Sequence, residues 1–122
     1  MLARAAKMYQ NVDLESAPKT QILDRLFERF ARDIDDARTA IGAKDILAKA
    51  AALDHAARIV IELRSALDHA AAPELAGHLD ALYVFVTDKL TEASFAMTVG
   101  PLAHATRVMT TLADGFRKAH QK

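Results

Sequence analysis

Cysteine and tryptophan are absent from this chain of 122 residues, and glycine, proline and aromatic residues are rare. Without cysteine the chain has no disulfide, no thiol nucleophile and no cysteine zinc site, which suits a reducing cytosol. Only four glycines and three prolines interrupt the sequence, so long helices can run unbroken. The hydrophobic fraction is nevertheless 52%, and much of it is alanine and leucine, which favour helix. The composition predicts a single all-α domain.

The chain also has no excess of positive or negative charge, because 16 basic residues balance 16 acidic residues and the two kinds alternate along the chain. A nucleic-acid-binding protein would need a basic stripe, so we expect no nucleic-acid partner. No apolar run approaches the ~20 residues that a membrane-spanning helix needs, so we expect no membrane insertion. The N-terminus lacks the apolar stretch of a signal peptide. We therefore expect a cytoplasmic protein.

Apolar residues recur at spacings of three and four along four segments, which predicts four helices. These helices are expected near residues 19–41, 45–70, 73–97 and 101–119. Gly42 stops the first helix, Asp45 caps the second and Pro73 begins the third. Short connections make successive helices antiparallel, so residues 18–122 are predicted to form an up-down four-helix bundle. Residues 1–17 show no sustained period and are expected to form an N-terminal arm, with room for a short extra helix.

Three of the predicted helices carry more apolar residues than one core-facing stripe can hold. Consecutive helical residues point ~100° apart, so runs such as Ile59–Ile61 and Leu82–Val86 cannot face one core, and Val108 lies beside Met109. One interpretation is a wide buried stripe, or cover by the N-terminal arm. The other is a groove for a partner helix. The candidate groove residues are Ile59, Ile61, Val84, Phe85 and Val108.

No motif for catalysis or metal binding is present. The five histidines are His55, His69, His78, His104 and His120. None belongs to the His-Glu-x-x-His motif of zinc proteases or to the Glu-x-x-His motif of metal-binding helical bundles. In the adjacent pairs Asp54–His55 and Asp68–His69, the two side chains would point in different directions on a helix. We expect exposed polar histidines, no cofactor, no metal and no enzyme activity.

Several segments in order along the chain resemble one known family. These segments are Tyr9 with Ser16–Ala17, Ile22–Glu28, Ile59–Leu63, Leu82–Phe85 and Leu90–Ala93. Together they resemble the FliS family of flagellar secretion chaperones, over about residues 9–119. The chain departs from the family pattern at Arg25, where a methionine is usual, at Phe27, where a tyrosine is usual, and at Phe116, where a tryptophan is common.

The resemblance implies a cytoplasmic chaperone that binds the C-terminal segment of flagellin and prevents its premature polymerisation. It also implies delivery of this cargo to a component of the flagellar type III export gate. In the family the N-terminal arm folds over part of the binding surface, which makes Tyr9, Val12 and Leu14 a removable cap. The groove residues proposed above would then contact the cargo.

Two other classes of protein fit the same residues. One is a helical adaptor or self-associating bundle, in which the spare apolar face binds a different partner or forms a homodimer. The other is a bundle enzyme or metal protein, which the missing ligand patterns disfavour. Co-elution with the flagellin C-terminal segment separates the chaperone from the adaptor, and metal analysis addresses the last class.

Overall fold

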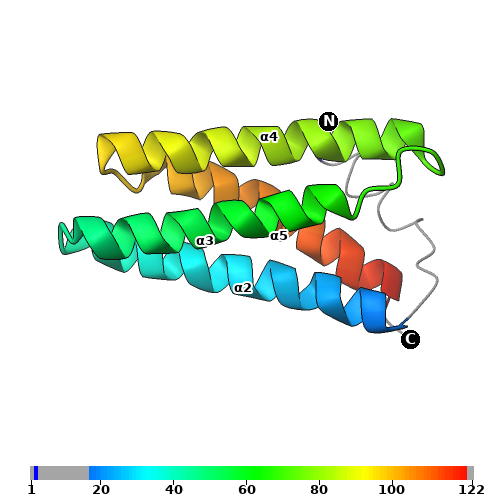
Figure 1. The fold of residues 1–122 in the computed structure, drawn as a ribbon, viewed down its shortest axis with the longest axis horizontal. Helices are drawn as coiled ribbons and strands as arrows, with labels where there is room; N and C mark the ends of the chain where they lie inside the picture. The colour runs from blue at the N-terminus through cyan, green and yellow to red at the C-terminus, as the bar shows by residue number, and fades with distance from the viewer. Residues whose placement is uncertain (1, 3–16, 121–122) are drawn as a thin grey trace.

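The computed structural model describes residue 2 and residues 17–120, and the latter form an antiparallel bundle of four helices. The helices are α2 (Ala17–Gly42), α3 (Ile46–Ser65), α4 (Pro73–Ala96) and α5 (Gly100–His120). Successive helices run in opposite directions (Figure 1). Helix α2 packs against α3 and α5, and α4 packs against the same two helices from the other side. The predicted all-α, up-down bundle is confirmed.

The predicted helix boundaries are close to the observed ones, and local hydrogen bonds explain most of them. The Asp45 carboxylate accepts a hydrogen bond from the Ala48 N–H at 3.0 Å and so caps α3, as predicted. Pro73 occupies the first turn of α4, where its missing N–H costs nothing. Lys44 and Met97 end α2 and α4 with left-handed backbone conformations, at φ values of 57° and 52°.

Helix α3 is shorter than predicted, since it ends at Ser65 and not near residue 70. The reason is Asp68, whose side chain accepts hydrogen bonds from the backbone N–H groups of Ala70 and Ala71 at 3.1 and 2.9 Å. An aspartate that bonds to the backbone just after it favours a turn over helix. The connection to α4 is therefore longer than the sequence pattern suggested.

The core is apolar along the whole bundle and contains most of the aromatic side chains. Tyr83, Phe30 and Phe116 are among the largest fully buried residues. The Phe27 and Phe116 rings lie 5.8 Å apart between centroids, and the Phe116 and His120 rings lie 4.5 Å apart. Phe27 and Phe116 are two of the positions at which the sequence departs from the family pattern that it resembles. The two departures therefore lie in one contact of the core.

Two charged residues are buried in the part of the chain that the structure describes, and both have partners. The Asp33 carboxylate on α2 contacts His55 Nδ1 on α3 at 2.5 Å and Arg29 Nε at 3.3 Å. Lys49 Nζ on α3 donates a hydrogen bond to the Ser94 carbonyl near the end of α4 at 3.1 Å. Burying a charge is costly unless it is paired, so these contacts hold α3 in a fixed register against both neighbours.

Two further ion pairs between helices lie toward the end of the bundle where α2 begins and α5 ends. Arg117 Nε on α5 lies 2.8 Å from Asp24 Oδ1 on α2, and this hydrogen bond raises the pKa of the Arg117 guanidinium above its usual value. Arg64 Nε on α3 lies 2.8 Å from Asp80 Oδ1 on α4. Both pairs are partly exposed, so they fix the alignment of the helices more than they stabilise the fold.

Gly77 gives a first testable prediction about stability. It lies inside α4 with an ordinary backbone φ, and a Cβ added there would meet nothing within 4 Å. Glycine in a helix interior is about 0.5–1 kcal/mol less favourable than alanine. We expect Gly77→Ala to raise the free energy of unfolding by about that amount in urea titrations. The matched change Ala81→Gly should lower it, and a loss of stability in Gly77→Ala would contradict the open environment of this site.

Candidate partner-binding surface

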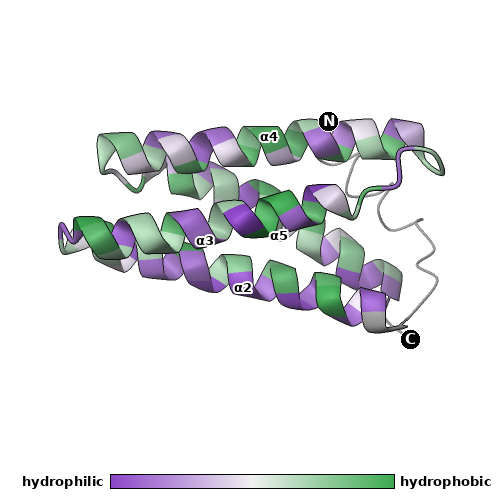
Figure 2. Cartoon of the chain, in the orientation of Figure 1, coloured by the Kyte–Doolittle hydropathy of each residue, from purple (hydrophilic) through white to green (hydrophobic). Residues whose placement is uncertain are grey.

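Large exposed apolar side chains concentrate on α3, α4 and the turn that follows α4. Among the described residues there are eight of these, namely Ile22, Ile46, Leu47, Ile61, Val84, Phe85, Phe95 and Val99. All of them except Ile22 lie between residues 46 and 99, on or just after the two helices whose many hydrophobic residues, buried and exposed, appear green in Figure 2. Apolar surface gathered in one region marks an interaction site more often than scattered residues do.

Three of the five groove residues predicted from sequence are accessible to solvent. Ile61, Val84 and Phe85 are 58%, 39% and 38% exposed. The other two, Ile59 and Val108, are buried in the core. Each of the two packs on the core face because it lies three or four residues from other buried positions, and every helix in this bundle contacts two neighbours. The prediction that they are left over from the core is therefore wrong.

The outer side of the α3–α4 pair has two hollows. The first, of about 330 Å³, lies between one half of α3 and the end of α4. Its lining comprises Ala50, Leu53, Asp54, Ala57, Thr87, Leu90, Thr91, Ser94 and Phe95. Most of these side chains are small, so the two helices do not fill the space between them. The second hollow, of about 280 Å³, is lined by Ile61, Arg64, Ser65 and Asp80.

Val84 lies on the face of α4 that joins the two hollows. It is four residues after Asp80 and three before Thr87, and such neighbours share a helix face. We name the two hollows together with Val84 the α3–α4 surface. Large apolar side chains stand at both of its ends, Phe95 at one and Ile61 at the other. This shape can receive the apolar stripe of a helix.

Phe85 belongs to a different side of α4. Its side chain points ~100° away from that of Val84, because the two are consecutive on a helix. Lys89 Nζ lies 5.5 Å from the centroid of the Phe85 ring and 3.0 Å from a Glu92 carboxylate oxygen. A lysine over an aromatic ring shields part of the ring from water. The predicted site residues are therefore not one cluster, since Ile61 and Val84 share a surface that excludes Phe85.

A further hollow, of about 400 Å³, lies between α2 and α5. Phe27, Phe30 and Met109 contribute apolar lining, while Glu28, Arg32, Asp35, Arg38 and Arg117 line it with charges of both signs. None of the large exposed apolar residues takes part in it. It therefore lacks the accessible apolar side chains that distinguish the α3–α4 surface.

Residues 2 and 17–120 contain no group of three or more side chains arranged to hold a metal ion. Within the same residues no helix has the length and apolar character that crossing a bilayer requires.

Comparison with known proteins decides the family. The sequence model described as "Flagellar protein FliS" matches residues 1–122. The chain belongs to the FliS family. It is also 28% identical over 117 residues to the flagellar secretion chaperone FliSB of Pseudomonas aeruginosa, and the match covers 93% of each chain. The family resemblance drawn from the sequence is therefore confirmed, and it places this FliS chain among chaperones.

The predicted cap residues of the FliS chain, Tyr9, Val12 and Leu14, lie outside the residues that the structure describes. So does the rest of the predicted arm up to residue 16, with the exception of Leu2. Leu2 is partly buried and packs against the hydrophobic core. The chain therefore contacts the bundle close to its first residue.

Helix α4 of the FliS chain also carries an exposed line of residues, beside its core stripe, that apolar spacing alone did not predict. Gly77, Ala81, Val84, Asp88, Thr91 and Phe95 follow one another at alternating spacings of four and three, and all six are exposed. We name these six residues the outer seam. Its spacing is visible in the sequence, but its residues are interleaved with the apolar residues of the core stripe on the same helix, such as Leu82, Val86 and Leu90. The two sets of residues can be told apart only by their burial in the structure.

Proposed function

We propose that this FliS chain binds the C-terminal segment of flagellin in the bacterial cytosol, prevents its premature polymerisation and delivers it to the flagellar type III export apparatus. The observation that carries the proposal is the accessible apolar α3–α4 surface on a bundle of this family. The similarity to a protein named as a flagellar secretion chaperone supports it.

The α3–α4 surface suits a segment that folds as it binds. A helix in this position would cover Ile61, Val84 and Phe95, whose apolar area is now in water. Burial of apolar area stabilises by about 25 cal/mol per Å², and part of this gain is offset by the cost of ordering the segment. Binding of this kind needs no catalytic group, and it also covers the apolar stripe through which the cargo would otherwise assemble.

Residues 1–17 are proposed as a separate arm that caps the bundle of residues 18–122. The partial burial of Leu2 against the core supports this division, because it brings the beginning of the chain onto the bundle. Tyr9, Val12 and Leu14 would supply the apolar contacts of the cap, and cargo would displace them. The arm released in this way is a candidate contact for a component of the export gate.

Filament assembly tests the proposed function. Monomeric flagellin is mixed with the full chain at ratios up to equimolar, and polymerisation is followed by light scattering after seeding. We expect assembly to fall in proportion to the chaperone and to stop near an equimolar ratio. Flagellin without its C-terminal segment should not bind the chain in co-elution. Unchanged assembly at an equimolar ratio would contradict the proposal.

Removal of the arm gives a prediction about competition. If residues 1–15 only compete with cargo, a variant lacking them should bind the flagellin C-terminal segment more tightly, because no preformed contact has to be displaced. Calorimetry on the two proteins measures the difference, which we expect to be about tenfold. Weaker binding by the truncated variant would show that the arm contacts the cargo itself.

A further inference from the structure

The outer seam of α4 has the residue spacing of a coiled-coil interface, although no helix of the described bundle covers it. Alternating steps of four and three residues keep side chains along one line of a helix, as at the a and d positions of a heptad repeat. From Gly77 to Phe95 the seam extends about 27 Å at 1.5 Å per residue. Five of its six residues carry no charge: Gly77 and Ala81 are small, Val84 and Phe95 are apolar, and Thr91 is a small polar residue. The exception is Asp88, near its centre.

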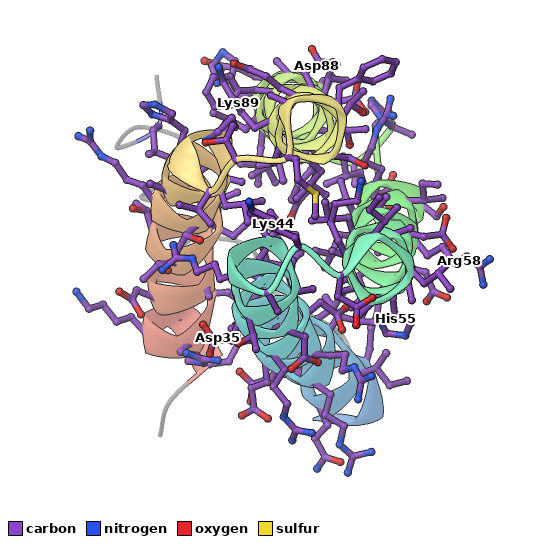
Figure 3. The ribbon with its side chains drawn as sticks, turned by 90° about the vertical axis from the view of Figure 1, so that its left-hand side faces the viewer. Asp35, Lys44, His55, Arg58, Asp88 and Lys89 are labelled. Carbon is purple, nitrogen blue, oxygen red and sulfur yellow. The ribbon has the colours of Figure 1, made fainter. Side chains whose placement is uncertain are left out.

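Asp88 has no hydrogen bond or ion pair among residues 17–120, and its side chain is exposed. Figure 3 shows it on the side of α4 that points away from the bundle. A single charged residue at a seam position disfavours partners that leave it unpaired and favours those that supply the opposite charge. The carboxylate is therefore a specificity element in an otherwise apolar line.

The charge of the surrounding helices has the same sign. Residues 46–96 contain seven acidic and four basic residues, a net charge of −3 in a chain whose total is zero. Three of the four basic residues there, Arg58, Arg64 and Lys89, are paired with Asp54, Asp80 and Glu92. The fourth, Lys49, is buried and bonded to a backbone carbonyl. A partner that approaches α4 thus meets apolar side chains, a local excess of negative charge and the unpaired carboxylate of Asp88.

We propose that the outer seam receives one helix of the partner protein, and that a lysine or arginine at the centre of this helix pairs with Asp88. The inference rests on the proposed function, in which this helix is part of the flagellin C-terminal segment. It adds which kind of helix the seam would bind, namely one whose apolar stripe is interrupted by a lysine or arginine. Gly77 and Ala81 let the partner backbone approach closely at one end, and Phe95 supplies a large contact at the other.

A second copy of this chain fits the seam less well. The seam is symmetrical about its midpoint, so an antiparallel pair of copies would place Asp88 against Val84 of the other copy. A parallel pair would place Asp88 against Asp88. Both arrangements bury carboxylates without a cation, which is costly. The same carboxylate that selects a basic partner therefore disfavours self-association.

Charge reversal tests the selection. Calorimetry measures binding of the flagellin C-terminal segment to the wild-type chain, Asp88→Lys and the matched control Asp36→Lys. Asp36 is likewise exposed, and it lies on α2, away from the seam. We expect Asp88→Lys to weaken binding on the order of tenfold at low salt, less at high salt, and Asp36→Lys to change it by less than about twofold. One lysine or arginine of the segment, replaced by glutamate, should restore binding to Asp88→Lys.

Self-association gives a readout that does not depend on the cargo. Asp88→Leu completes an apolar seam, so we expect this variant to dimerise in sedimentation experiments at concentrations where the wild type and Asp36→Leu stay monomeric. If the wild type binds the segment but Asp88→Lys binds as Asp36→Lys does, the inference is wrong and the proposed function stands. If the wild type does not bind, the proposed function fails, and sedimentation alone decides whether the seam is an interface. A monomeric Asp88→Leu would overturn the inference.

Discussion

Replacing Phe116 with alanine should remove a large part of the stability of this chain, with an expected loss of about 3–5 kcal/mol in the free energy of unfolding. Phe116 is almost fully buried, and its ring packs against Phe27 and His120. Truncation removes apolar contacts to α2 and leaves a cavity that the surrounding helices can fill only in part. A domain of this size has a total stability of about 5–15 kcal/mol, so the variant is expected to be largely unfolded in mild denaturant.

Urea unfolding followed by circular dichroism measures this loss, and Phe95→Ala provides the matched control. Phe95 is 92% exposed, so the same substitution there should change stability by less than about 0.5 kcal/mol. A loss below about 1 kcal/mol in Phe116→Ala would mean that the end of α5 does not pack on α2 as the structure has it.

Changing Ile61 and Val84 together to aspartate should weaken binding of the flagellin C-terminal segment on the order of a hundredfold. The two residues lie on the α3–α4 surface, where a bound helix would cover them. Burial of two new carboxylates without partners adds a desolvation cost to the lost apolar contacts. Because both side chains are now exposed, the fold itself should be little affected, and the unfolding midpoint should stay close to that of the wild type.

Ile22→Asp is the matched control for this experiment. Ile22 is 55% exposed, close to the 58% of Ile61, but it lies on α2. We expect calorimetry to show wild-type affinity for Ile22→Asp and a strong loss for Ile61→Asp. Equal affinities in these two single variants would remove the α3–α4 surface from the proposed site.

Much of the fold could be predicted from the sequence because its signals are local. Apolar residues spaced by three and four define the helices, and Asp45 and Pro73 mark where α3 and α4 begin. The end of α3 was misplaced because the turn there depends on hydrogen bonds of Asp68 rather than on apolar spacing. The arrangement of helices followed from the short connections.

The candidate site was predictable only in part, because the burial of a residue depends on which residues of other helices pack against it, and the sequence pattern does not identify them. A surplus of apolar residues identified Ile61 and Val84, yet it selected Ile59 and Val108 as well, which face the core. The hollows of the α3–α4 surface arise from the register of two helices, which places Ala57 and Thr87 in the same lining. No spacing within one helix contains that information.

The most direct test of the proposed function is a calorimetric titration of the full chain with the C-terminal segment of flagellin, beside a titration with the N-terminal segment of the same flagellin. We predict a one-to-one complex with the C-terminal segment and a negative heat-capacity change, which marks burial of apolar surface. No heat should accompany addition of the N-terminal segment. Absence of binding to the C-terminal segment, or equal binding to both segments, would contradict a flagellin chaperone that acts through the α3–α4 surface.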